Sequence, residues 1–181
     1  LANVTILDKN LDRLRHLDQI CVGRTTTLAS NRGSIERALV DADLVVGAVL
    51  VAGARAPIVV SEDMVRTMKP GSVIVDVAVD QGGCIATTHE TTHTDPIYMQ
   101  HGVVHYAVGN MPGAVPYTST YSLTNATLPY QIEVARLGAR GAVEQSEALR
   151  HGLNTAHGLV SNDVVARELN LAFVEPLTAL S

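Results

Sequence analysis

Residues 73–83 read Val-Ile-Val-Asp-Val-Ala-Val-Asp-Gln-Gly-Gly, and this stretch decides the fold class. Its β-branched residues predict a buried strand over residues 72–79, and the glycine pair predicts a tight turn directly after it. On this interpretation Asp76 lies in the middle of the strand and Asp80 lies at its carboxyl end. Ligands of open α/β sheets bind at that edge. Asp80 is therefore better placed than Asp76 to meet a substrate.

Strands and helices alternate on both sides of this stretch, up to about residue 110. We expect strands at residues 4–7, 25–28, 43–47 and 103–108, and helices at residues 9–17 and 31–40 and from Ser61 to the stop at Lys69-Pro70-Gly71. This order is typical of βαβ units around a parallel, doubly wound sheet of the Rossmann type. The fold class we predict is therefore α/β.

The pattern changes after Pro116 and becomes helical. We expect helices over residues 117–137, 142–150 and 161–169. Gly138 is expected to end the first of them, and Pro129 to kink it because proline removes a backbone donor. The change places a domain boundary near residue 115, so that residues 1–115 form one domain and residues 116–181 belong to a second.

Composition narrows the function classes. The 181 residues carry 13 Lys and Arg against 18 Asp and Glu, a formal charge of −5, and 46% are hydrophobic. Such a chain is neither disordered nor rich in the basic residues typical of nucleic-acid binding. The longest apolar run, residues 44–54, is shorter than the roughly 20 residues of a membrane helix. Cys21 and Cys84 match neither a disulfide framework nor a metal site. We expect a cytoplasmic protein without membrane or nucleic-acid partners.

One motif is deceptive. Residues 89–93, His-Glu-Thr-Thr-His, match the zinc-protease spacing, which needs both histidines on one helical face. Five threonines among residues 87–96, with Pro96 at the end, make a poor helix. We therefore expect a polar surface loop here and no metal site.

Two further features indicate a dinucleotide site. Asp8 ends the first predicted strand, and in dinucleotide-binding folds an acidic residue at the end of the second strand binds the adenosine ribose. No G-x-G-x-x-G occurs in the chain, so we expect that the first strand and its glycine-rich turn are missing. Residues 108–113, Val-Gly-Asn-Met-Pro-Gly, end another strand with glycines that allow close approach of a ligand. An ordinary loop carboxylate at Asp8 and a simple tight connection at the glycines are the alternatives.

Residues 73–83 and 84–88 with Asp95-Pro96, together with residues 108–116, resemble the L-alanine dehydrogenase family of bacteria. Residues 42–50, 56–60 and 118–120 fit the same family, so the resemblance covers essentially the whole chain. It implies NAD-dependent, reversible deamination of L-alanine to pyruvate and ammonia by a cytoplasmic homohexamer. A transhydrogenase α-type subunit and a non-catalytic NAD-binding module are the alternatives. The run Asp80-Gln81-Gly82-Gly83 favours the dehydrogenase.

The resemblance also implies roles for single residues. Asp80 would be the active-site carboxylate that works with a histidine in acid–base chemistry. Arg13, where we expect lysine in many relatives, would lie with Asp8 and Ser30 at the adenosine end of the cofactor. The cofactor-binding residues implied are Asp8, Arg13 and Ser30 at the adenosine, Val49 and Leu50 along the NAD site, and Val77, Ala78, Val79, Asp80, Val108, Gly109, Asn110 and Met111 around the nicotinamide and its ribose.

The resemblance implies that the family's catalytic histidine and its substrate-binding lysine and arginine lie in an amino-terminal region outside this chain. The resemblance implies that the helices of residues 116–181 are part of a discontinuous domain. We expect the chain alone to be inactive.

Overall fold

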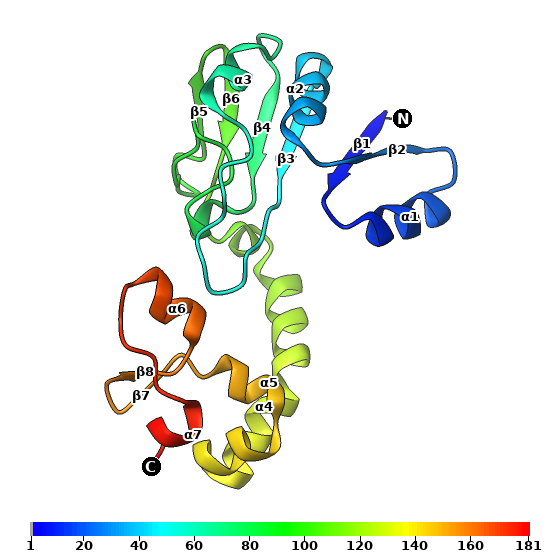
Figure 1. Cartoon of the computed structure of the whole chain (residues 1–181). Coiled ribbons are helices and arrows are strands. Elements are labelled where there is room, and N and C mark those ends of the chain that lie inside the picture. Colours follow the sequence, from blue (N-terminus) through cyan, green and yellow to red (C-terminus); the bar gives the residue numbers. More distant parts are fainter. Residues whose placement is uncertain (1) are drawn as a thin grey trace. The chain divides into compact units, whose positions relative to one another are not determined.

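A computed structural model describes residues 2–181 (Figure 1); Leu1, the first residue of the predicted nucleotide-binding domain, lies outside them. The chain forms two compact units. The first contains residues 2–49 and 56–109, and the second contains residues 50–55 and 110–181. We describe each unit separately.

The first unit opens with a βαβ motif. Strands β1 (Val4–Asp8) and β2 (Thr25–Ala29) are parallel, in register from Val4 opposite Thr25 to Asp8 opposite Ala29, and helix α1 (Leu11–Ile20) connects them. The side chain of Asn10 caps the start of α1. It accepts a hydrogen bond from Arg13 N (3.0 Å), as is typical of an N-cap. Helix α2 (Arg32–Asp41) follows.

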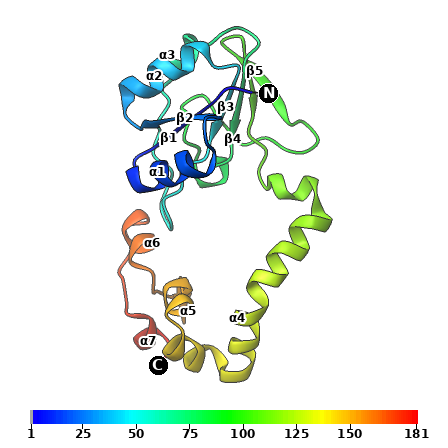
Figure 2. The same cartoon turned by 90° about the vertical axis from the view of Figure 1, so that its right-hand side faces the viewer.

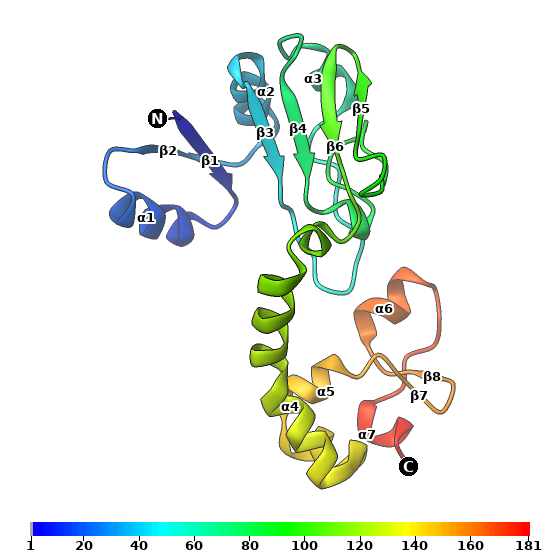
Figure 3. The same cartoon turned by 180° about the vertical axis from the view of Figure 1, so that it is seen from behind.

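A second sheet has the order β3-β4-β6-β5, with the strands side by side in Figure 3. Strands β3 (Leu44–Gly47), β4 (Val73–Asp76) and β6 (Val103–Tyr106) are parallel, as predicted. Helix α3 (Glu62–Arg66) follows Ser61, whose side chain caps it by accepting from Met64 N, so the predicted start of this helix at Ser61 is confirmed. The core joins this sheet to its helices through Leu39 of α2, Val65 of α3 and Ile74 of β4. The α/β, Rossmann-type prediction is therefore confirmed.

The prediction missed strand β5 (Ile97–Gln100), which runs antiparallel to β6 at the edge of the sheet. The two strands are joined at His101 and Gly102, with φ values of 54° and 77°. Two consecutive positive φ values are typical of a two-residue hairpin turn. The sheet is thus not purely parallel.

The strand predicted over residues 72–79 is shorter than expected. β4 ends at Asp76, and a 3-10 turn, η1 (Val79–Gln81), follows it. Asp76 is therefore the last residue of the strand rather than a mid-strand residue, and Asp80 lies in the turn beyond it. The expectation that Asp80 ends the strand was wrong. The chain turns directly after Asp76, because the backbone N–H groups of Ala78 and Cys84 donate hydrogen bonds to the Asp76 side chain.

The Asp76 side chain is fully buried and accepts five hydrogen bonds. Its Oδ1 accepts from Ala78 N (3.0 Å) and from the Cys84 thiol (3.4 Å). Its Oδ2 accepts from Cys84 N (2.9 Å), Ile85 N (3.3 Å) and Thr88 Oγ1 (2.6 Å). A buried carboxylate is tolerated only when it is bonded in this way. One side chain thus fixes the whole segment from residue 77 to residue 88.

The second unit is mainly helical. Helix α4 (Pro116–Gln145) contains one non-helical residue, Gly138 (φ 69°, ψ 170°), and Figure 2 shows the chain changing direction along it. The predicted stop at Gly138 is therefore confirmed. Pro129, expected to kink the helix, lies within a helical stretch.

The remaining elements of this unit are short. They are a 3-10 turn η2 (Met111–Ala114), helices α5 (Glu147–Gly152), α6 (Asp163–Glu168) and α7 (Pro176–Ala179), and strands β7 (Thr155–Ala156) and β8 (Leu159–Val160). The helix predicted over residues 142–150 is divided at Ser146, which caps α5. The hairpin β7-β8 was not predicted; its turn is again His-Gly, His157 and Gly158, both with positive φ. No helix in the described part of the chain is long and apolar enough to cross a membrane.

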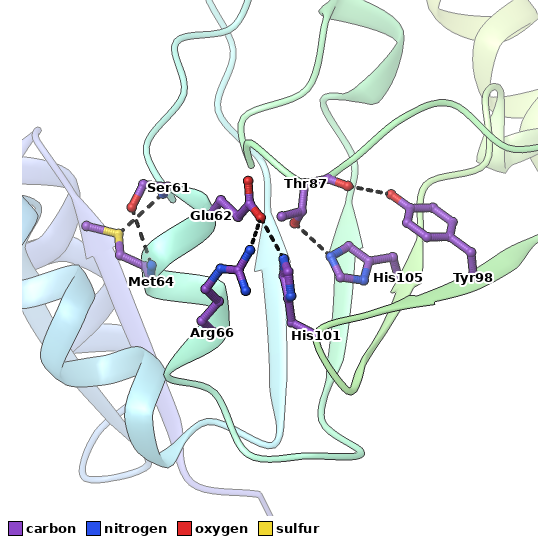
Figure 4. Close-up of polar contacts among 8 residues, drawn as sticks. All are labelled: Ser61, Glu62, Met64, Arg66, Thr87, Tyr98, His101 and His105. Atoms are coloured by element: carbon purple, nitrogen blue, oxygen red, sulfur yellow. Dashed lines mark hydrogen bonds and ion pairs between the residues drawn. The ribbon is translucent and has the colours of Figure 1, made fainter.

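His105, a buried residue of β6, ties the sheet to the segment after η1 (Figure 4). Its Nδ1 donates to Val103 O (2.9 Å), so its Nε2 is left to accept from the Thr87 hydroxyl (2.8 Å). Its ring stacks on Tyr98 at 5.0 Å between centroids. Burial lowers the pKa of His105, which keeps the ring neutral.

We expect Asp76→Asn to destabilise the protein by about 2–4 kcal/mol, because the amide would turn an N–H group toward donors in a buried site. Urea unfolding measures this change. Asp18→Asn, at an exposed position of α1, is the control and should change the free energy of unfolding by about 0.5 kcal/mol or less. A similarly small effect of Asp76→Asn would contradict the role given to this carboxylate.

His105 predicts a pH-dependent stability. Because its pKa is lowered in the folded state, the unfolded chain binds the proton more tightly. The contribution of His105 is complete above the ordinary histidine value of 6.5 and is lost as the pH falls through the lowered folded value. In urea unfolding at pH 7.5 and about pH 5, His105→Phe should be less stable than wild type at pH 7.5 but lose less stability on acidification. His16→Gln, an exposed control, should keep the wild-type dependence; an unchanged dependence in His105→Phe would refute the assignment.

Candidate functional site

The site is built where β4 and β6 end. These neighbouring strands are parallel, so their carboxyl ends share one edge of the sheet. The segment after β4 carries Val77, Ala78, Val79 and Asp80, and the segment after β6 leads to Val108 and Gly109. The structure thus places the predicted nicotinamide residues of the first unit after two adjacent strands.

These residues differ in exposure. Asp80 is exposed and Val77 is half-exposed, whereas Ala78, Val79 and Val108 are buried. The exposed carboxylate of Asp80 is free to meet a ligand, while the buried side chains support the turn from beneath. Ala78 holds the turn together because its carbonyl accepts from Gln81 N (2.9 Å) and Gly83 N (3.0 Å).

Two glycines allow the dense packing around Asp76. A Cβ atom at Gly83 would lie 2.8 Å from Thr88 Oγ1 and 3.1 Å from Asp76 Oδ2, and Gly83 has a φ of 74°. A Cβ atom at Gly47 would lie 2.6 Å from Cys84 Sγ. Burial, with a smaller contribution from the Asp76 charge, raises the pKa of Cys84 to about 12. Cys84 is therefore a thiol at neutral pH and serves the packing.

Gln81 was not predicted to be a site residue from the sequence, although it follows Asp80 directly. Its backbone carbonyl accepts from Ala56 N (2.9 Å), which anchors the turn to the loop after β3. Its side-chain oxygen is buried and has no hydrogen-bond partner within the described part of the chain. Buried acceptors are normally bonded, so this atom is suited to a donor from a bound molecule. Only the structure could reveal it, because sequence says nothing about the burial of one atom.

The adenosine-end residues predicted from the sequence come together at the end of β1. Asp8 Oδ1 accepts from Asn10 N (2.8 Å), and Arg13 Nη1 lies 3.8 Å from Asp8 Oδ2. Ser30 N donates to the backbone carbonyl of Asp8 (2.9 Å). Asp8 is partly exposed, so its second oxygen can accept further hydrogen bonds. A carboxylate beside a strand end suits the hydroxyls of a ribose.

The other predicted cofactor residues lie where the chain passes from one unit to the other. Val49 is the last residue of its segment in the first unit, and Leu50, which is exposed, begins the loop assigned to the second. Gly109 is the last residue of the first unit, and Asn110 and Met111, which follow it in the sequence, belong to the second. Asn110 has a left-handed φ of 55°, a conformation that asparagine tolerates better than most residues.

The His-Glu-Thr-Thr-His motif is not helical. Thr91 forms a parallel bridge with Val108, and His89 stacks on Tyr98 at 3.9 Å between centroids. The loop prediction is thus confirmed, and the zinc-protease geometry is not formed. Among residues 2–181 no group of three or more His, Cys, Asp or Glu side chains is arranged to hold a metal ion.

A further polar cluster lies near α3 (Figure 4). Glu62 accepts from His101 Nε2 (2.8 Å) and from Arg66 Nη2 (2.5 Å). The hydrogen bond from His101, followed by that from Arg66, lowers the pKa of Glu62. This cluster fastens the turn between β5 and β6 to α3. Its role is structural, since it lies on the turn at which β5 ends and β6 begins, and the candidate site follows the other end of β6.

The chain is similar to known proteins named alanine dehydrogenase. Alanine dehydrogenase of Bacillus subtilis (strain 168) is 56% identical over 180 residues, which cover 99% of this chain and 48% of that protein. Alanine dehydrogenase of Methanococcus maripaludis is 52% identical over 181 residues. The chain spans about half the length of the curated relatives it matches.

Solved structures show the same fold. An L-alanine dehydrogenase matches with a TM-score of 0.81 and 49% identity over 93% of this chain and 46% of that one. A transhydrogenase from Sinorhizobium meliloti matches with a TM-score of 0.59 at 24% identity, covering 66% of this chain and 33% of that one, a likeness of fold alone. The model of the family "Alanine dehydrogenase/PNT, C-terminal domain" matches residues 1–163. The chain therefore belongs to the alanine dehydrogenase/PNT family, in the part formed by its C-terminal domain.

Proposed function

We propose that this chain is part of an NAD-dependent alanine dehydrogenase, which converts L-alanine reversibly to pyruvate and ammonia. One observation carries the proposal: an exposed carboxylate, Asp80, stands on a turn that the buried Asp76 holds rigid at the carboxyl edge of a parallel sheet. Active-site groups need such fixed positions. The relatives named alanine dehydrogenase support the substrate.

The residues present fit NAD at two places. The partly exposed Asp8 has acceptor capacity for ribose hydroxyls, and Arg13 and Ser30 lie beside it. Gln81 supplies a buried oxygen without a partner in the described chain, suited to an N–H donor. We assign Val49, Leu50, Val77, Ala78, Val79, Asp80, Val108, Gly109, Asn110 and Met111 to the rest of the cofactor site.

When bound, NAD supplies the hydride acceptor. The residues of this chain orient the reacting molecules and assist the proton transfers. We assign to Asp80 the stabilisation of a cationic imidazole, or the orientation of the water that attacks the imino carbon. The catalytic histidine, and the lysine and arginine that bind the substrate, come from a part of the enzyme outside this chain. Asp76 keeps the Asp80 turn in place and takes no part in proton transfer.

We assign residues 1–115 to the NAD-binding domain and residues 116–181 to a discontinuous substrate domain. The exposure of α4 supports the second assignment, since Tyr117 and Leu123 are 77% and 65% exposed. Large apolar side chains are exposed together where another surface covers them. We further propose that the complete enzyme is a cytoplasmic homohexamer.

Asp80→Asn tests the catalytic assignment in the full-length enzyme. We expect the turnover number for L-alanine to fall about 100-fold or more. Asp95→Asn, at an exposed position, is the matched control and should keep wild-type turnover. Near-normal turnover in Asp80→Asn would refute the role of Asp80. If no amino acid supports NAD reduction by the full-length protein, the proposed dehydrogenase activity itself is refuted.

The isolated 181-residue chain should form no NADH from L-alanine and NAD, because only part of the active site is present. Absorbance at the NADH band measures this, with the full-length enzyme as positive control at equal molar concentration. Robust alanine-dependent reduction by the isolated chain would show that no residue outside it is needed.

A further inference from the structure

Glu90, the acidic residue of the deceptive motif, is held beside the end of β6. Its neighbour Thr91 donates its N–H to Ala107 O (2.9 Å), and Thr91 O accepts from Gly109 N (3.2 Å). The bridge between Thr91 and Val108 thereby adds a short parallel pairing to the carboxyl end of β6. The backbone at residue 90 is thus fixed against the segment that we assign to the nicotinamide.

The Glu90 side chain lies directly on the Cα atom of Gly109. A Cβ atom at Gly109 would overlap Glu90 Oε1 and would lie 2.8 Å from Glu90 Cδ. Gly109 does not have a positive φ, so its backbone conformation alone does not require glycine. The absence of a side chain at this position therefore makes room for the carboxylate.

This carboxylate is not committed to another group. Glu90 is exposed, and its carboxylate forms no hydrogen bond or ion pair with any residue of the part that the structure describes. Of the other carboxylates near this edge of the sheet, Asp76 is fully bonded within the protein, and Asp80 is exposed on the neighbouring turn. The exposed Glu90 carboxylate, which lies against Gly109, therefore brings negative charge to the segment that we assign to the nicotinamide.

We propose that Glu90 makes the cofactor site discriminate between the oxidised and the reduced nicotinamide. This inference rests on the proposed NAD site. The oxidised ring carries a positive charge and the reduced ring is neutral, so a nearby carboxylate stabilises the oxidised form selectively. Because Glu90 is exposed, solvent screens this interaction, and the expected discrimination is about threefold.

The test measures equilibrium binding to the full-length enzyme in the absence of substrate. Dissociation constants for NAD and NADH are determined by isothermal titration calorimetry for the wild type and for Glu90→Gln, a substitution that keeps size and hydrogen bonding but removes the charge. Glu168→Gln, at an exposed position of α6, is the matched control. The ratio of the NAD constant to the NADH constant should rise about threefold in Glu90→Gln and stay unchanged in the control.

Salt provides an independent arm. Between about 0.05 and 1 M NaCl the wild-type ratio should move toward that of Glu90→Gln, because screening weakens the interaction of exposed charges. A ratio unchanged by Glu90→Gln, or an equal weakening of both cofactors, would overturn the inference. If the wild type binds neither cofactor, the proposed NAD site itself fails, which is a distinct result.

Discussion

The buried carboxylate of Asp76 is the interaction on which the candidate site depends. Removing a charge from water is costly, and in this protein the cost is offset by five donors from residues 78–88. Because those donors belong to the segment after β4, satisfying the carboxylate and shaping the turn are the same event. Asp80 gains its position as a consequence. The glycines at positions 47 and 83 are part of this arrangement, since side chains there would collide with the cluster.

Two strand-ending aspartates illustrate how burial separates roles that sequence makes look alike. Asp8 and Asp76 both close a parallel strand. Asp8 retains 31% exposure of its side chain and has only Asn10 N and a distant Arg13 as partners, so it can still bind a ligand. Asp76 is completely buried, and its carboxylate oxygens already accept hydrogen bonds from within the protein. The first therefore suits recognition, and the second suits support.

Much of the first unit could be predicted because its signals are local. Runs of Val and Ile and the helix start at Ser61 are set by neighbours in the chain. Both missed hairpins turn on a His-Gly pair, at residues 101–102 and 157–158. Histidine is not among the usual first residues of such turns, so its signal was weak. The early end of β4 and the free oxygen of Gln81 depend on contacts in space, which no local pattern contains.

Helix α4 shows the limit of describing this chain as self-sufficient. Between residues 116 and 137 its charged residues are Glu133 and Arg136 alone. Tyr117, Tyr121, Leu123, Leu128 and Ile132 are all at least half exposed. Large apolar side chains exposed together in this way are typical of a surface that another surface covers. One part of the chain's hydrophobic content thus forms the core between the sheet and its helices, whereas another part lies exposed on α4, where its burial requires a surface that these residues do not supply.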